Sequence, residues 1–198
     1  MSENNKAILA GEFVSSCVYD HTVFGEDFYK VTMESARRSG VFDRIDIIIS
    51  ERLVDISKIQ EHVFATVKGE FRSHSLKQDG KKRLLLFLFA EEVEFSPEVI
   101  YKNEVMLKGY VREPATFRKT PVSEVPITDL MITVLREYHK SDRIPCIAWN
   151  RNALFAKDLM VNSEVKIQGR MQSRDYVKRT SDGEEKRTAY EVSIYSII

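Results

Sequence analysis

The sequence contains the same pattern twice, and this internal repeat constrains the fold more than any other feature. Residues 5–14 read NKAILAGEFV and residues 103–112 read NEVMLKGYVR. Three more matches follow: DRI at 43–45 with 142–144, VKGEFRS at 67–73 with IQGRMQS at 167–173, and Asp-Gly at 79–80 with 182–183. All four keep their order, at offsets of 98, 99, 100 and 103 residues. The repeat therefore predicts a tandem duplication of a unit of about 95 residues, an ordinary domain size.

The repeat divides the chain into a first domain at 1–96 and a second at 97–198. The connection between them, AEEVEFSPEVIYKN at 90–103, contains one proline and no flexible Gly/Ser tract. This composition predicts two domains that are held against each other and do not swing freely.

Both units predict the same order of elements. A first strand carries an internal glycine (Gly11, Gly109), and two strands follow at 28–36 and 43–50, or 130–136 and 143–149. A short helical segment comes next, at 51–60 or 151–160, with Ser50 or Asn150 at the capping position. Two last strands are joined across the Asp-Gly pair, a strong hairpin signal. This is the strand order of the OB barrel. The predicted fold is all-β with short helices, in two tandem five-stranded OB-fold barrels.

Composition is ordinary for a globular protein, with 43% hydrophobic and 30% charged residues and a formal net charge of zero. Residues 1–97 carry 13 Lys and Arg against 16 Asp and Glu, and residues 98–198 carry 17 against 14, so the second half is the basic one. No apolar run has the length of about 20 residues that spans a bilayer, and no secretory signal is recognisable. Cys17 and Cys146 form no CxxC, which favours free thiols in a cytosolic setting.

Enzyme and cofactor signatures are absent from the sequence. The eight glycines form neither GxGxxG nor GxxxxGK[ST], and the four histidines show no metal-ligand spacing. We expect no enzymatic activity, no cofactor and no metal.

One strand of the second unit, VKIQGRMQSRDY at 165–176, alternates apolar or small residues with polar, mostly cationic ones that end in Tyr176. In DRIPCIAWNR the tryptophan, Trp149, shares its strand face with Arg143 and Arg151. Rings interleaved with cations are what single-stranded nucleic acid requires, because bases stack on rings while cations follow phosphates. The alternatives are a Trp149 that packs under the neighbouring helix and strand faces that are merely solvated.

From Asn103 onward the chain resembles the bacterial single-stranded DNA-binding proteins. The matching pieces are NEVMLKGYV, EPATFRKT, IPCIAWNRNALFA, VKIQGRMQSRDY and DGEEKRTAYEVSI. The resemblance implies base stacking on Trp149, Tyr176 and Tyr138, and phosphate contacts from Arg118 and Arg151. The full set of predicted nucleic-acid-binding residues is Arg118, Arg136, Tyr138, Arg143, Trp149, Arg151, Arg170, Arg174, Tyr176 and Lys178.

The first unit differs at the matching positions, with Ser50 for Trp149, Leu76 for Tyr176 and Glu70 for Arg170. A phosphate chain avoids carboxylates, so this barrel is predicted to bind DNA weakly or not at all on that face. Its last strand contains LLLFLFA at 84–90, apolar on both faces, which predicts either a packing surface or a well-filled core.

The predicted function is binding and protection of single-stranded DNA, without sequence specificity, in replication, recombination or repair. RNA binding is an open possibility. The alternative is an OB-fold assembly module of a primosome or recombination complex. The resemblance implies a homodimer with four OB folds. The chain ends on YEVSIYSII and not on the acidic tail usual in the family, so tail-mediated recruitment of other proteins is not expected.

Overall fold

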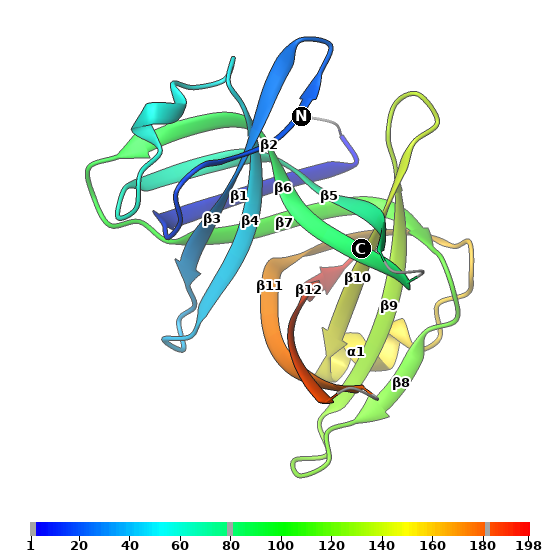
Figure 1. The fold of residues 1–198 in the computed structure, drawn as a ribbon. Coiled ribbons are helices and arrows are strands. Elements are labelled where there is room, and N and C mark those ends of the chain that lie inside the picture. Colours follow the sequence, from blue (N-terminus) through cyan, green and yellow to red (C-terminus); the bar gives the residue numbers. More distant parts are fainter. Residues whose placement is uncertain (1–2, 79–80, 181–182) are drawn as a thin grey trace.

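The computed structural model describes residues 3–78, 81–180 and 183–198 (Figure 1), apart from the side chains at 78, 81, 82, 175, 176, 178–180 and 185–187. The first half contains β1 (Asn5–Phe13), β2 (Val18–Val23), β3 (Glu26–Ala36), β4 (Phe42–Ser50), the 3-10 turn η1 (Ile56–Lys58), β5 (Phe64–Gln78) and β6 (Lys81–Ser96). The second contains β7 (Lys102–Val111), β8 (Thr116–Lys119), β9 (Pro126–Leu135), β10 (Ser141–Trp149), α1 (Asn150–Ala156), β11 (Glu164–Thr180) and β12 (Gly183–Ile197). The predicted all-β class with short helices is confirmed.

Each half closes into a barrel in the same way. β1 pairs with β5 and, at its end, with β3, while β4 and β6 pair in parallel. β7 makes the equivalent pairs with β11 and β9, and β10 pairs in parallel with β12. Gly11 and Gly109 lie where the first strand changes partner, and an added Cβ there would overlap the carbonyl group of Glu34 or Thr133. The internal glycines therefore permit the close approach that closes each barrel.

The short strands β2 and β8 were not predicted. They pair with β3 and β9 at the outer edge of each barrel, and all their residues are exposed. β5 pairs with β6 and β11 pairs with β12, as predicted, but residues 79, 80, 181 and 182 of the predicted Asp-Gly turns lie outside the described residues, and Gly183 begins β12.

The predicted helices are wrong in part. The segment at 51–60 forms only the single turn η1, with no buried residue and with Asp55 as its cap. In the second unit α1 buries Ala153 and Ala156 and ends at Ala156, four residues before the predicted end. Its N-cap is Trp149 and not Asn150, and Trp149 makes no capping hydrogen bond with its side chain.

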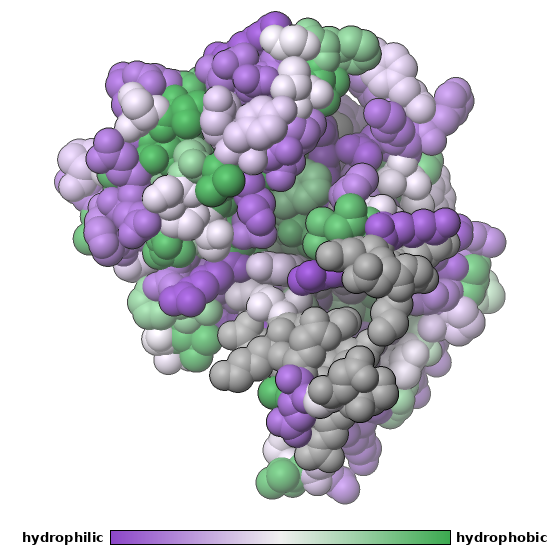
Figure 2. Space-filling view, viewed as in Figure 1, coloured by the Kyte–Doolittle hydropathy of each residue, from purple (hydrophilic) through white to green (hydrophobic). Residues whose placement is uncertain are grey.

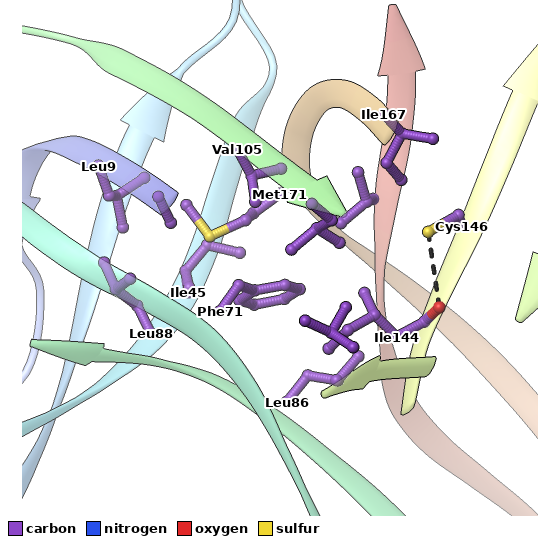
Figure 3. Close-up of a cluster of buried hydrophobic side chains, with 14 of the residues drawn as sticks. Leu9, Ile45, Phe71, Leu86, Leu88, Val105, Ile144, Cys146, Ile167 and Met171 are labelled. Carbon is purple, nitrogen blue, oxygen red and sulfur yellow. Dashed lines mark hydrogen bonds between the residues drawn. The ribbon is translucent and has the colours of Figure 1, made fainter. Parts of the chain in front are cut away.

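The two barrels share one continuous sheet, because β1 pairs with β7. Ala7 lies opposite Val105, and these two residues are equivalent positions of the repeat. The barrels are therefore related by an approximate twofold axis. Their cores also form one cluster, in which Phe71 and Leu86 of the first barrel lie near Ile144 and Met171 of the second (Figure 3).

Two buried aspartates join the barrels on either side of this axis. Asp43 of the first barrel accepts a hydrogen bond from the Ser173 amide of the second at 3.1 Å. Asp142 of the second accepts one from the Ser73 amide of the first at 2.7 Å. Arg37 pairs with Asp43, and Arg136 pairs with Asp142 at 3.0 Å. We call these two contacts the aspartate locks; they fix the orientation of one barrel relative to the other.

Hydrophilic and hydrophobic residues are intermixed over the first barrel on the face shown in Figure 2. Within the described residues, no helix has the length and apolar character needed to cross a membrane.

Candidate nucleic-acid interface

The outward face of β10 carries Arg143 near its start and the tryptophan at its end, and Arg151 follows in α1. Inward-facing Ile144, Cys146 and Ala148 are buried, as their alternation predicts. Trp149 is partly exposed at the end of the strand, and Arg143 and Arg151 are exposed at the start of the strand and in the first turn of α1. Ile147 departs from the pattern, since it belongs to the outward set but is buried.

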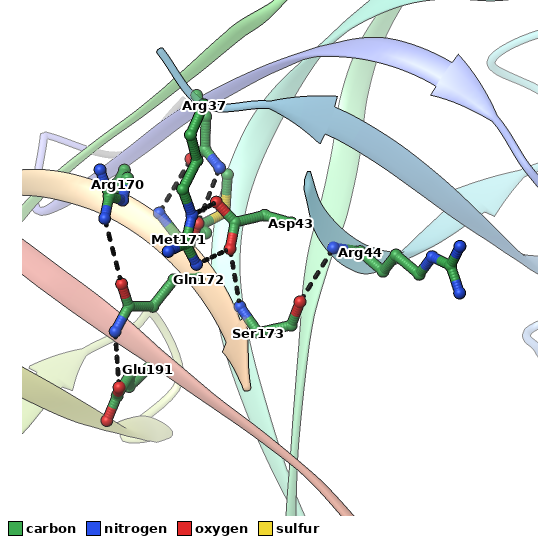
Figure 4. A network of polar contacts seen from close by, with 9 residues as sticks. Arg37, Asp43, Arg44, Arg170, Met171, Gln172, Ser173 and Glu191 are labelled. Carbon is green, nitrogen blue, oxygen red and sulfur yellow. Dashed lines mark hydrogen bonds and ion pairs between the residues drawn. The ribbon is translucent and has the colours of Figure 1, made fainter. Parts of the chain in front are cut away.

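The outward face of β11 is cationic at Arg170 and Arg174, but the two side chains differ in freedom. Arg174 is exposed. Arg170 is partly buried and donates to the Gln172 amide oxygen at 3.5 Å, and Gln172 in turn donates to Glu191 of β12 at 2.6 Å (Figure 4). Arg170 is therefore held near the strand, while Arg174 can extend into solvent.

Tyr176 and Lys178 continue β11, where their backbones pair with Arg187 and Glu185 of β12. Their side chains lie outside the described residues. Tyr138 lies in the loop between β9 and β10, with 86% of its surface exposed and a left-handed backbone at φ 56°.

Two of the predicted arginines are paired with carboxylates. Arg118 of β8 donates to both carboxylate oxygens of Asp129, at 2.7 and 3.2 Å, and these hydrogen bonds raise the pKa of Arg118. Arg136 belongs to the second aspartate lock, and burial raises the pKa of its partner Asp142. The Arg118 pair is exposed, so a phosphate can compete for it. Arg136 faces a fully buried carboxylate and has a structural role in the lock.

A shallow cavity of about 230 Å³ lies between β9, β10 and the β7–β8 loop. Pro145 and Met131 line it together with three carboxylates, those of Glu113, Asp129 and Glu191. Carboxylates repel phosphate, but Asp129 is paired with Arg118, so the cavity leaves Glu113 and Glu191 as the carboxylates that disfavour a phosphate there.

Comparison with known protein families gives a match that covers the second barrel. Residues 102–197 match the model of the Single-strand binding protein family. The second barrel belongs to this family. The sequence-based recognition of a tandem OB-fold form of the single-strand binding proteins is thereby confirmed. Such proteins act by binding, and the chain is not an enzyme.

Solved structures agree on the fold of the whole chain. The wild-type single-stranded DNA-binding protein of Thermus aquaticus is 18% identical with a TM-score of 0.79, and the match covers 98% of this chain and 91% of that one. A deletion mutant of the same protein is 17% identical with a TM-score of 0.77, covering 98% and 93%. No curated protein sequence matches the chain. At these identities the likeness establishes the tandem fold.

The first barrel presents a different face from the single-strand binding barrel. Its Glu70 is buried and pairs with Arg72 at 2.8 Å. The Arg72 guanidinium lies 3.8 Å above the ring of Phe89. Ser50, which stands at the repeat position of Trp149, donates a hydrogen bond from its hydroxyl to the Glu26 carboxylate. Of the apolar run at 84–90, Leu86, Leu88 and Ala90 are buried, whereas Leu85, Phe87 and Phe89 are partly exposed.

One residue beside the interface was missed by the sequence analysis. Arg44 of β4 is the repeat equivalent of Arg143, since both stand in an Asp-Arg-Ile triplet. The signal for Arg44 is therefore the repeat itself, which places this arginine at the position of Arg143.

Proposed function

We propose that the protein binds single-stranded DNA without sequence preference on the β10–β11 face of the single-strand binding barrel. The observation that supports this most is Trp149, partly exposed between Arg143 and Arg151 in a barrel that belongs to this family. Bases stack on Trp149, and the cations Arg143, Arg151, Arg170 and Arg174 follow the phosphates. Tyr138, Tyr176, Lys178 and Arg118 extend this face, while Arg136 holds the barrels together.

The proposed role is to coat and protect single strands during replication, recombination or repair, in the cytosol. The first barrel contributes no base-stacking face, because its acidic and paired side chains Glu70, Arg72 and Asp46 replace the cationic face of the second.

The test is a titration of intrinsic tryptophan fluorescence with oligo-dT, since the chain has one tryptophan. Stacking on Trp149 predicts strong quenching. The affinity should fall with salt, with a log–log slope of about −0.7 for each phosphate contacted. The matched variant Trp149→Ala, followed by anisotropy of a labelled oligonucleotide, should lose about 5- to 150-fold in affinity, the equivalent of one stacked base. Full affinity in Trp149→Ala would move the site away from β10.

Two finer points have their own measurements. Oligo-dU and oligo-U compared at one salt concentration separate DNA from RNA preference, because stacking alone does not distinguish the sugars. An absence of binding to either polymer at low salt would refute the proposal and leave the assembly module as the better explanation.

We also propose that two chains associate to bring four barrels together. Apolar side chains remain exposed where the β6–β7 connection crosses β4: Phe42 and Tyr101 pack edge to face at 6.2 Å, and Val41 and Val99 are 51% and 68% exposed. Sedimentation of the whole chain as a monomer at micromolar concentration would contradict this.

A further inference from the structure

The first barrel touches the binding strand of the second at one defined point. Ser173 of β11 donates its amide to Asp43 and accepts a hydrogen bond on its hydroxyl from the Arg44 amide at 2.9 Å (Figure 4). The next residue of β11 is Arg174, which is exposed and belongs to the proposed interface. The start of β4 therefore lies directly beside the cationic end of β11.

One exposed arginine of the first barrel, Arg44, lies at this contact, and the other arginines of the β3–β4 hairpin lie farther along it. The Arg44 side chain is 69% exposed, and Arg38 is exposed in the β3–β4 loop. Arg37 is different, because its guanidinium is mostly buried and pairs with Asp43. Arg44 also contacts Glu34 at 2.7 Å, but an exposed ion pair contributes only about 0–1 kcal/mol, so a phosphate can compete for the arginine.

The approximate twofold axis repeats this arrangement. The Arg143 amide donates to the Ser73 hydroxyl at 2.8 Å, just as the Arg44 amide donates to Ser173. Arg44 and Arg143 therefore occupy equivalent positions, each at the junction and each with its backbone fixed by a serine of the other barrel. A fixed backbone limits where the guanidinium can reach, which favours a defined contact over a diffuse charge.

We propose that the DNA path of the single-strand binding barrel continues across this junction and that Arg44 binds a phosphate leaving β11. The first barrel then lacks a stacking face but still supplies backbone contacts. This inference rests on the proposed function, because it extends the same site from Arg174 onto the first barrel.

The experiment measures the salt dependence of oligo-dT binding for Arg44→Ala and for a matched control, Arg52→Ala. Arg52 is also an arginine of the first barrel, its side chain is 65% exposed, and it also pairs with a glutamate, Glu26 at 3.5 Å. It lies just beyond the opposite end of β4, which is about 20 Å from Arg44 along the strand. The two variants thus remove the same charge from different ends of one strand.

Arg44→Ala should lower the magnitude of the log–log slope by about 0.7, the value of one phosphate contact on single strands. Between about 50 mM and 300 mM salt, this variant should lose roughly three- to fourfold less affinity than the unchanged protein. Arg44→Lys keeps the charge and should keep the slope, while Arg52→Ala should match the unchanged protein. Trp149 quenching at saturation should be the same in all variants, because the stacking site is intact.

An unchanged slope in Arg44→Ala, with the unchanged protein still binding, would overturn the inference and leave the proposed function standing. A lower slope in Arg52→Ala together with an unaltered Arg44→Ala would also overturn it, because the first barrel would then contact DNA at its other end. If the unchanged protein bound no DNA at low salt, the proposed function and this inference would both fail.

Discussion

The first aspartate lock should be a main source of stability at the junction, and Asp43→Ala tests this. The Asp43 side chain is 1% exposed, accepts from Arg37 through both carboxylate oxygens, and accepts from the Ser173 amide. Removing it leaves the Arg37 guanidinium, 20% exposed, without its carboxylate. Removal of one partner of a buried ion pair costs about 3–5 kcal/mol. Because Arg37 retains some access to water, we expect the lower end, about 3 kcal/mol.

The control is an exposed pair of opposite charges. Lys102 and Glu104 lie 3.2 Å apart with side chains 44% and 61% exposed. Glu104→Ala should therefore cost about 0–1 kcal/mol. Urea unfolding of both variants, monitored by circular dichroism, gives the two values. If Asp43→Ala lay within about 1 kcal/mol of Glu104→Ala, water would be compensating the lost carboxylate and the lock would not stabilise the junction.

Three further predictions follow from burial. Burial raises the pKa of the Asp142 carboxyl in the folded protein. Its contribution to the free energy of unfolding is therefore fully present below the ordinary aspartate pKa of about 3.9, and is lost as the pH rises through the raised pKa. The Asn side chain of Asp142→Asn cannot ionise, so urea unfolding should show that this substitution destabilises the protein less at pH 7 than at pH 4. A larger destabilisation at pH 7 would refute the raised pKa of Asp142. Gly169→Ala places a Cβ against the Ser193 carbonyl and should cost at least about 1–3 kcal/mol, measured as a lower urea midpoint; an unchanged midpoint would mean that the strands separate easily. Burial raises the pKa of Cys146 strongly and that of Cys17 as well, so iodoacetamide should leave Cys146 unmodified in the native protein, and rapid labelling of both thiols would contradict the structure.

Most of the fold was predictable because the repeat shows the residue pattern of each strand in two independent sequences. Alternation in two copies specified which residues of β5 and β11 face inward, and Val67, Gly69, Val165 and Ile167 are all buried. The short strand β2 was missed because all its residues are exposed, so neither of its faces carries a burial pattern. β8, equally exposed, was missed for the same reason.

The helix predicted at 51–60 is wrong because the two repeat units differ at the residues that pack the helix against the barrel. α1 packs Ala153 and Ala156 against its barrel, and the Ala153 carbonyl accepts from Thr128 at 2.8 Å. The equivalent segment has Val54 and Asp55 in this region, and Asp55 caps a new turn at Ser57. The β-branched Val54 replaces Ala153, the residue whose carbonyl bonds to the sheet, and the Asp55 cap starts a shorter turn in its place.

At the interface, sequence predicted residue types better than their partners. Arg143 and Trp149 lie on the outward face of β10, as a period of two predicts, whereas Arg151 belongs to α1 and Ile147 of the same face is buried. Arg136 could not be separated from them by sequence, because its partner Asp142 becomes a buried carboxylate only when the second barrel packs against Ser73 of the first. The same contact across barrels places Arg44 beside Arg174, and no pattern within one strand records it.

The first barrel therefore supports the second in two ways that follow from one interface. β7 lies between β1 and β11, so β1 covers an edge that would otherwise expose unpaired backbone groups beside the buried Val105 and Leu107. The same packing brings Asp43 and Arg44 to Ser173, at the cationic end of the binding strand. The face of the first barrel that carries Ser50 takes no part in these contacts, so the proposed binding strand β11 depends on the junction of the first barrel and not on that face.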